Sequence, residues 1–180
     1  MSSQSLEQLS NLRPLTRLVT GHDQHGKSEL HESSTFQWSH HDDAKMTFSV
    51  AYSTSSSPPV LTNDADLEAH KAAMARGMGL VNPRGSVLRF VDIAPGHVCA
   101  MHRTRSLDYG IVLEGEVELV LDDGVSKMRR GDVAVQRATM HQWRNASENE
   151  WARMVFVLQD CQAGVEEDLG DGGWLPPSGN

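Results

Sequence analysis

The segment Met101–Gly124, MHRTRSLDYGIVLEGEVELVLDDG, decides the fold class of this chain. Its second half alternates, with Val117 and Leu119 on one face of an extended strand and Glu116 and Glu118 on the other. The Asp-Asp-Gly that closes it is typical of a hairpin turn, because glycine accepts the backbone angles that tight turns need. The segment therefore predicts a half-buried β-strand that ends in a turn.

Short runs of the same kind follow one another from Gly85 onward, and glycine-bearing turns separate most of them. Besides the opening segment, these runs are SVLRFVDIAPG, GDVAVQR, HQWRN and WARMVFVLQD. Regular short strands with turn signals indicate an all-β sandwich or a closed barrel.

The part before Gly85 predicts further elements that pack on this barrel. TRLVTGHDQHGKSELHESS indicates a hairpin that turns at His25 and Gly26, AKMTFSVAYSTS a strand, SSSPPV a loop and NDADLEAHKAAMARG one short helix. We expect a flexible arm over residues 1–12, an N-terminal extension over 13–84, the barrel core over 85–161 and an acidic tail rich in glycine and proline over 162–180.

The composition fits one small globular domain. The 180 residues are 38% hydrophobic and carry a net charge of −8, which opposes phosphate backbones and anionic lipids. No apolar run approaches the length of a membrane span, and no N-terminal stretch resembles a signal peptide. Cys99 and Cys161 are too few for a disulfide framework. We expect a cytoplasmic protein without nucleic-acid or membrane partners.

Three residues carry the candidate chemistry, namely His102, Asp108 and His141. Strands that are distant in the sequence become neighbours in a barrel, so these side chains are expected to converge inside it. Two imidazoles and one carboxylate suit a divalent metal such as Fe, Zn, Mn, Ni or Co. A histidine beside a strand is also a common structural residue, and the spacing alone leaves both interpretations open.

The glycines around these residues make the pattern more specific. Gly96, His102, Asp108 and Gly115 resemble the first motif of the cupin superfamily, and GDVAVQRATMHQWRN, residues 131–145, resembles the second. The resemblance implies a jelly-roll barrel (double-stranded β-helix) with a pocket inside and an N-terminal strand extension. The chain is most similar to the small single-domain cupins that fungi and bacteria use on small molecules.

The chain departs from the cupin motif at the metal ligands. Family members often use three histidines and a glutamate, but Thr104 stands in place of the second histidine and Asp108 in place of the glutamate. The resemblance therefore implies at most a site of two histidines, His102 and His141, and one carboxylate, with open coordination positions. The alternative is that the metal has been lost and that the three residues act as acid–base or hydrogen-bonding groups.

The other pocket residues are predicted from strand alternation and from the motif. His141 and Trp143 should point the same way, since they lie two apart on one strand, and Trp143 would form an aromatic wall for a planar substrate. Substrate is expected at the position that Thr104 leaves open. The predicted substrate-binding residues are Thr104, Gln136, Trp143, Tyr109 and Tyr52.

We expect an enzyme of secondary metabolism that acts on a small oxygenated molecule by dehydration, decarboxylation or isomerisation, assisted by a divalent metal. A metal with few protein ligands polarises a substrate carbonyl, and a nearby histidine or aspartate moves the proton. The alternatives are an Fe(II)-dependent oxygenase and a non-catalytic barrel that binds a small molecule. We also expect a homodimer, because a two-fold related copy would cover the unpaired edge of the N-terminal strands.

Overall fold

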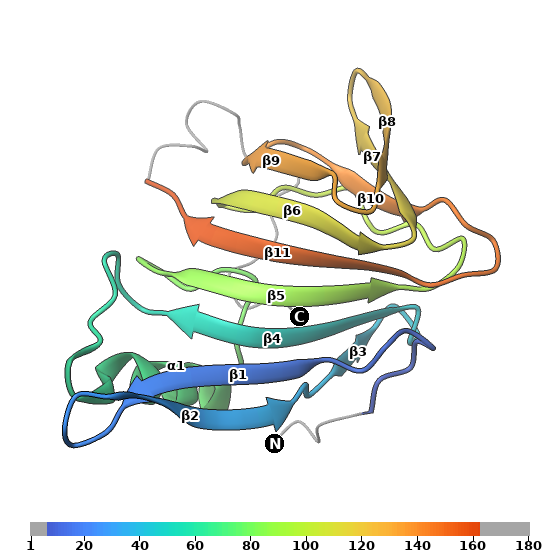
Figure 1. Cartoon of the computed structure of the whole chain (residues 1–180). Helices are drawn as coiled ribbons and strands as arrows, with labels where there is room; N and C mark the ends of the chain where they lie inside the picture. Colours follow the sequence, from blue (N-terminus) through green and yellow to red (C-terminus); the bar gives the residue numbers. More distant parts are fainter. Residues whose placement is uncertain (1–6, 163–180) are drawn as a thin grey trace.

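A six-stranded antiparallel sheet and a three-stranded sheet enclose the apolar core (Figure 1). The computed structural model describes residues 7–162. In spatial order, the large sheet consists of β3 (Ser39–His41), β4 (Met46–Thr54), β5 (Ser86–Ile93), β11 (Ala152–Asp160), β6 (Ser106–Glu114) and β9 (Val133–Arg137). The small sheet consists of β10 (Gln142–Asn145), β7 (Glu116–Leu121) and β8 (Gly124–Arg129). This arrangement confirms the predicted all-β jelly-roll fold, because strands far apart in the sequence pair side by side.

The N-terminal extension adds a separate hairpin and one helix to the barrel. Among the described residues, strands β1 (Thr16–His22) and β2 (Ser28–Thr35) pair only with each other, around the predicted turn. The one-turn helix η1 (Thr62–Asp64) leads into α1 (Ala65–Arg76), which confirms the predicted helix. Figure 1 shows the hairpin and α1 on the β4 side of the large sheet, away from β7, β8 and β10. Within residues 7–162, no helix is long and apolar enough to cross a membrane.

The core lies between the two sheets and follows the alternation of the strands. Its buried members come from both sheets and include Val87, Val91, Val112, Val117, Trp143, Met154, Phe156 and Leu158. Gly110 on β6 makes room for one of them, because a Cβ atom there would lie 2.8 Å from Cε1 of Phe156. The phenyl ring therefore lies directly against the backbone of β6.

A buried ion pair ties the N-terminal segment to the outer face of the large sheet. The guanidinium of Arg153 on β11 donates to both carboxylate oxygens of Asp92 on β5, at 2.5 and 2.6 Å. Arg153 also donates to the backbone carbonyl of Arg13 at 2.7 Å, and Ser10 donates to Asp92 at 2.5 Å. Part of the predicted flexible arm, residues 1–12, is thus held through Ser10, while residues 1–6 lie outside the described residues.

Candidate functional site

The fold brings His102 and His141 together, although 38 residues separate them in the sequence. His102 follows β5, and His141 directly precedes β10. The backbone N–H of each histidine donates to the carbonyl of the other, at 2.9 and 3.0 Å. The centroids of the two imidazole rings lie 4.3 Å apart. This part of the predicted site is therefore assembled by a local bridge between two segments.

Backbone carbonyls determine which nitrogen of each ring carries the proton. Nδ1 of His102 lies 2.8 Å from the carbonyl of Ala100, and Nδ1 of His141 lies 2.9 Å from the carbonyl of Thr139. A carbonyl only accepts hydrogen bonds, so both Nδ1 atoms are protonated and both Nε2 atoms keep a lone pair. A metal-ligating histidine commonly donates its other ring nitrogen in the same way.

The histidine pair is uncharged near neutral pH. Burial lowers the pKa of His102 below its ordinary value. Burial and the nearby charge of His102 lower the pKa of His141 to about 4. The pair is thus suited to act through its free lone pairs, as metal ligands or hydrogen-bond acceptors, rather than to carry protons at neutral pH.

A second group of polar residues lies on the inner face of β6 and β9. Asp108 and Gln136 are paired in register, and each is only 4% exposed. Burial raises the pKa of Asp108 to about 6. Oδ1 of Asp108 and both amide atoms of Gln136 are buried with no hydrogen-bond partner within residues 7–162, and the buried hydroxyl of Ser106 lies beside Asp108. Buried polar atoms normally have partners, so these atoms indicate where a polar ligand or water binds.

Ser106 was not among the residues predicted from the sequence. It lies two positions before Asp108 on the same strand, so its side chain points to the same face of the sheet. The alternation that predicted Trp143 from His141 also identifies Ser106, but a serine at the start of a strand carries no signal of its own.

The predicted set of three metal ligands is not assembled in the described part of the chain. Among residues 7–162, no three histidine, cysteine, aspartate or glutamate side chains lie close enough to hold one metal ion. Asp108 lies opposite Gln136 on β9 and Leu158 on β11. Two imidazoles with unprotonated Nε2 atoms are a donor type that suits divalent metals.

The remaining predicted residues lie in different environments. Thr104 is buried, 5% exposed, in the segment before β6. Trp143 belongs to the core, with its ring 6.2 Å from that of His141 and 5.6 Å from that of Phe156. Its ring packs edge-on to that of His141 within the core, and its role as a wall for substrate stays a prediction. Tyr109 and Tyr52 lie elsewhere.

The structure does not bring Tyr109 and Tyr52 to this site. Tyr109 is 38% exposed, because it follows Asp108 on β6 and strand alternation turns it to the outer face of the sheet. Tyr52 lies near the end of β4, where its ring stacks on His70 of α1 at 4.7 Å and its hydroxyl donates to Asp66. Their predicted roles in substrate binding stay predictions.

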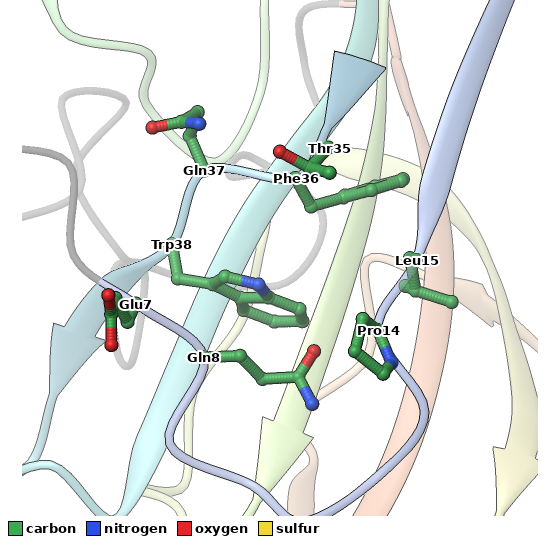
Figure 2. A pocket seen from close by; sticks show the side chains of 8 residues that line it. All are labelled: Glu7, Gln8, Pro14, Leu15, Thr35, Phe36, Gln37 and Trp38. Atoms are coloured by element: carbon green, nitrogen blue, oxygen red, sulfur yellow. The ribbon is translucent and has the colours of Figure 1, made fainter. Parts of the chain in front are cut away.

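Two cavities lie in the N-terminal part of the molecule, away from the histidine pair. One, of about 330 Å³, lies between the segment of Gln8 and Pro14 and the segment of Phe36 and Trp38 (Figure 2). The other, of about 400 Å³, is lined by the β1–β2 hairpin, β4 and α1, and includes Tyr52. Neither is lined by His102, Asp108 or His141, so we locate the candidate site by its chemistry.

Comparisons with known proteins agree with the barrel and its paired motifs. The model of the Cupin domain family matches residues 89–158. Phomopsin biosynthesis cluster protein D of Diaporthe leptostromiformis is 43% identical over 171 residues, which cover 90% of this chain and 87% of that protein. The cupin-domain-containing oxidoreductase virC of Hypocrea virens is 41% identical over 164 residues, covering 88% of this chain and 82% of that protein. The chain belongs to the cupin superfamily.

The likeness to solved structures is looser. KdgF from Halomonas sp. is 14% identical, with a TM-score of 0.47 over 70% of this chain and 87% of that chain. A match of this degree says nothing about the reaction.

Proposed function

We propose that this protein is an enzyme of secondary metabolism that acts on a small oxygenated molecule by dehydration, decarboxylation or isomerisation. The observation that carries the proposal is the pair of neutral histidines, whose Nε2 lone pairs are both free of protons. A similar protein is named for a biosynthesis cluster, which supports the metabolic setting.

Asp108 is the group that moves the proton in this proposal. Its pKa of about 6 lets it exist in both protonation states near neutral pH, which is the condition for efficient general acid–base catalysis. Gln136, directly opposite, offers an NH2 group that can donate to a substrate oxygen and a carbonyl oxygen that can accept from a substrate hydroxyl. Ser106 supplies a further hydroxyl on the same face.

His102 and His141 are the residues that would hold a divalent metal. Such an ion would act as a Lewis acid on a carbonyl or carboxylate of the substrate. The donor set of two imidazoles suits Fe, Zn, Mn, Ni or Co without selecting one of them. The hydrogen bonds to the carbonyls of Ala100 and Thr139 hold the proton of each ring on Nδ1. This tautomer leaves Nε2 free to bind a metal.

A second candidate is an Fe(II)-dependent oxygenase. It is supported by the name of virC, a cupin-domain-containing oxidoreductase 41% identical to this chain. A third, a non-catalytic binding barrel, is supported by the lack of a three-ligand group among residues 7–162. Stoichiometric iron and oxygen uptake in the presence of substrate would favour the oxygenase.

The metal is tested by metal analysis and by thermal unfolding with and without Ni²⁺, Zn²⁺ or anaerobic Fe²⁺. At a free metal concentration 100 times Kd, binding raises the free energy of unfolding by about 2.7 kcal/mol. We expect this rise in the parent and its loss in His102→Ala and His141→Ala. His25→Ala, in the exposed β1–β2 turn, is the control and should respond like the parent. Equal, ion-insensitive curves for all four proteins would reject the metal.

We also propose that the protein forms a homodimer, as predicted from its N-terminal strands. A second candidate interface is the outer face of β6 and β9, where Tyr109, Val133 and Val135 are exposed together. The cytoplasmic location stays a prediction.

A further inference from the structure

Arg89 is a charged residue on the inner face of the barrel. It lies on β5 between Val87 and Val91, which share its face by alternation and belong to the core. Its partners in register are Val50 on β4 and Phe156 on β11. Arg89 is only 4% exposed, so its guanidinium is buried among apolar side chains.

No acidic residue compensates this charge within residues 7–162. One guanidinium nitrogen, Nη2, donates to the carbonyl of Gly79 at 2.5 Å, and the group lies 5.1 Å from the centroid of the Phe48 ring. The Nε atom is buried without a hydrogen-bond partner in this part of the chain. Burial lowers the pKa of Arg89 to about 10, which leaves the side chain charged at neutral pH.

Arg153 shows how the same chain treats a buried arginine with a structural role. It is 2% exposed, on the outer face of the sheet, and it makes a two-pronged ion pair with Asp92. A buried charge without a partner is destabilising, so it is retained where something else compensates it. The planar guanidinium, with parallel N–H groups, matches a carboxylate best.

We propose that Arg89 binds a carboxylate group of the substrate, which makes the substrate an organic acid. A row of packed aromatic side chains connects Arg89 with the candidate site. Phe156 is its neighbour in register, the ring of Phe156 lies 5.6 Å from that of Trp143, and Trp143 lies beside His141. The inference rests on the proposed function in placing the substrate inside the barrel.

The sheet also sets the size of this acid. Arg89 lies on β5 and Asp108 on β6, with β11 between them. Two strand spacings, together with the two-residue offset of Asp108 from Arg89 in the register, amount to roughly 12 Å between backbone positions. An acid with an apolar body, such as an aromatic ring, would lie along the apolar inner face of β11, between its carboxylate at Arg89 and the atom that reacts near Asp108.

The test compares three acids with their neutral amides: acetate with acetamide, benzoate with benzamide, and phenylacetate with phenylacetamide. We expect at least one acid, and not its amide, to raise the melting temperature of the full chain. Arg89→Met should weaken the binding of that acid by roughly 30-fold or more. Arg76→Met, at the exposed end of α1, is the matched control and should respond like the parent. No difference between acid and amide in any pair, or an unchanged response of Arg89→Met, would reject the proposal.

Two further measurements keep the test independent of how well the variant folds. Without ligand, Arg89→Met should melt no lower than the parent, because it replaces an unpaired charge by an apolar side chain of similar length. A clear loss of stability would indicate a structural role instead. In the parent itself, the acid should shift one arginine Nε–H resonance in NMR spectra. No such shift at saturating acid would contradict binding to Arg89.

The carboxylate could also come from the chain itself, since Glu166, Glu167, Asp168 and Asp171 follow the described residues in the sequence. A full-length variant with all four changed to the corresponding amides separates the two sources. An unchanged affinity for the acid supports a substrate carboxylate. A gain of roughly tenfold or more would assign Arg89 to the chain's own acidic segment and reject the substrate role.

The failure of this inference can be told apart from the failure of the proposed metal site. If Arg89→Met no longer gains melting temperature from the acid but still gains it from the metal, the result supports carboxylate binding by Arg89 and leaves the metal site intact. His102→Ala, which should lose the metal response, should keep the preference for acid over amide. If it loses that preference, the histidine pair and not Arg89 recognises the carboxylate, and the inference is wrong.

Discussion

Burial determines the charge state of the individual residues in the candidate site. His102 and His141 are kept neutral, while the pKa of Asp108 rises from its ordinary value of 3.8 to about 6. The cause is the same in each case, because a low-dielectric environment disfavours the charged form of either kind of group. One environment thus provides lone pairs from the histidines and a proton carrier from the aspartate.

Asp108→Asn tests this effect through the pH dependence of stability. Because the folded protein holds the Asp108 proton more tightly than the unfolded chain, the parent loses stability as the pH rises from about 4 to about 6, and the loss is complete above that range. Relative to the parent, the variant should gain up to about 3 kcal/mol in free energy of unfolding at pH 8 and almost nothing at pH 4. Urea unfolding at both pH values measures the difference.

Asp123→Asn provides the control for this experiment, since Asp123 lies in the exposed turn between β7 and β8. It should show no gain that depends on pH. An Asp108→Asn protein whose stability relative to the parent is the same at pH 4 and pH 8 would show that Asp108 is not desolvated.

Between elements, β6 packs closely against β11 at Gly110. Gly110→Ala would place a methyl group 2.8 Å from the Phe156 ring. The ring or a strand would have to move, so we expect a loss of about 1–3 kcal/mol in free energy of unfolding, measured by urea denaturation. In a Phe156→Leu background the same change should cost clearly less, because the smaller side chain leaves room. An equal cost in both backgrounds would place the strain elsewhere.

At the scale of the whole molecule, Asp92 and Arg153 connect the N-terminal segment with the central strands. Asp92→Asn removes one charge and leaves the other buried, so it should lower the free energy of unfolding by about 3–5 kcal/mol. The double variant Asp92→Leu/Arg153→Met removes both charges and should recover most of this loss. Thermal or urea unfolding of the three proteins tests it. A double variant as unstable as Asp92→Asn would mean that the pair itself, and not the unpaired charge, matters.

The proposed homodimer also concerns the whole molecule. If two copies pair through the outer face of β6 and β9, Val135→Asp should place a charge in that interface and yield monomers in light scattering. Val125→Asp, on the exposed face of β8, is the control and should leave the mass unchanged. A parent protein that is monomeric at every concentration would rule out the dimer.

The sequence by itself determined the local elements and the class of fold. The strand Met46–Thr54, the turn at His25 and Gly26 and the helix Ala65–Arg76 were predicted because alternation, turn residues and helix ends act over a few residues. The spacing of Gly96, His102, Asp108 and Gly115 also indicated a cupin. Neither kind of pattern records distances between side chains on different strands.

Only the tertiary structure decided which polar groups meet. His102 joins His141 through a bridge between distant segments, while Asp108 faces Gln136 instead. Arg89 could not be assigned to a face from its strand, SVLRFVDI, because both faces of that strand are rich in apolar residues. Its burial inside the barrel follows from the pairing of β5 with β4 and β11. Such pairings depend on the closure of the whole sheet, which no local pattern encodes.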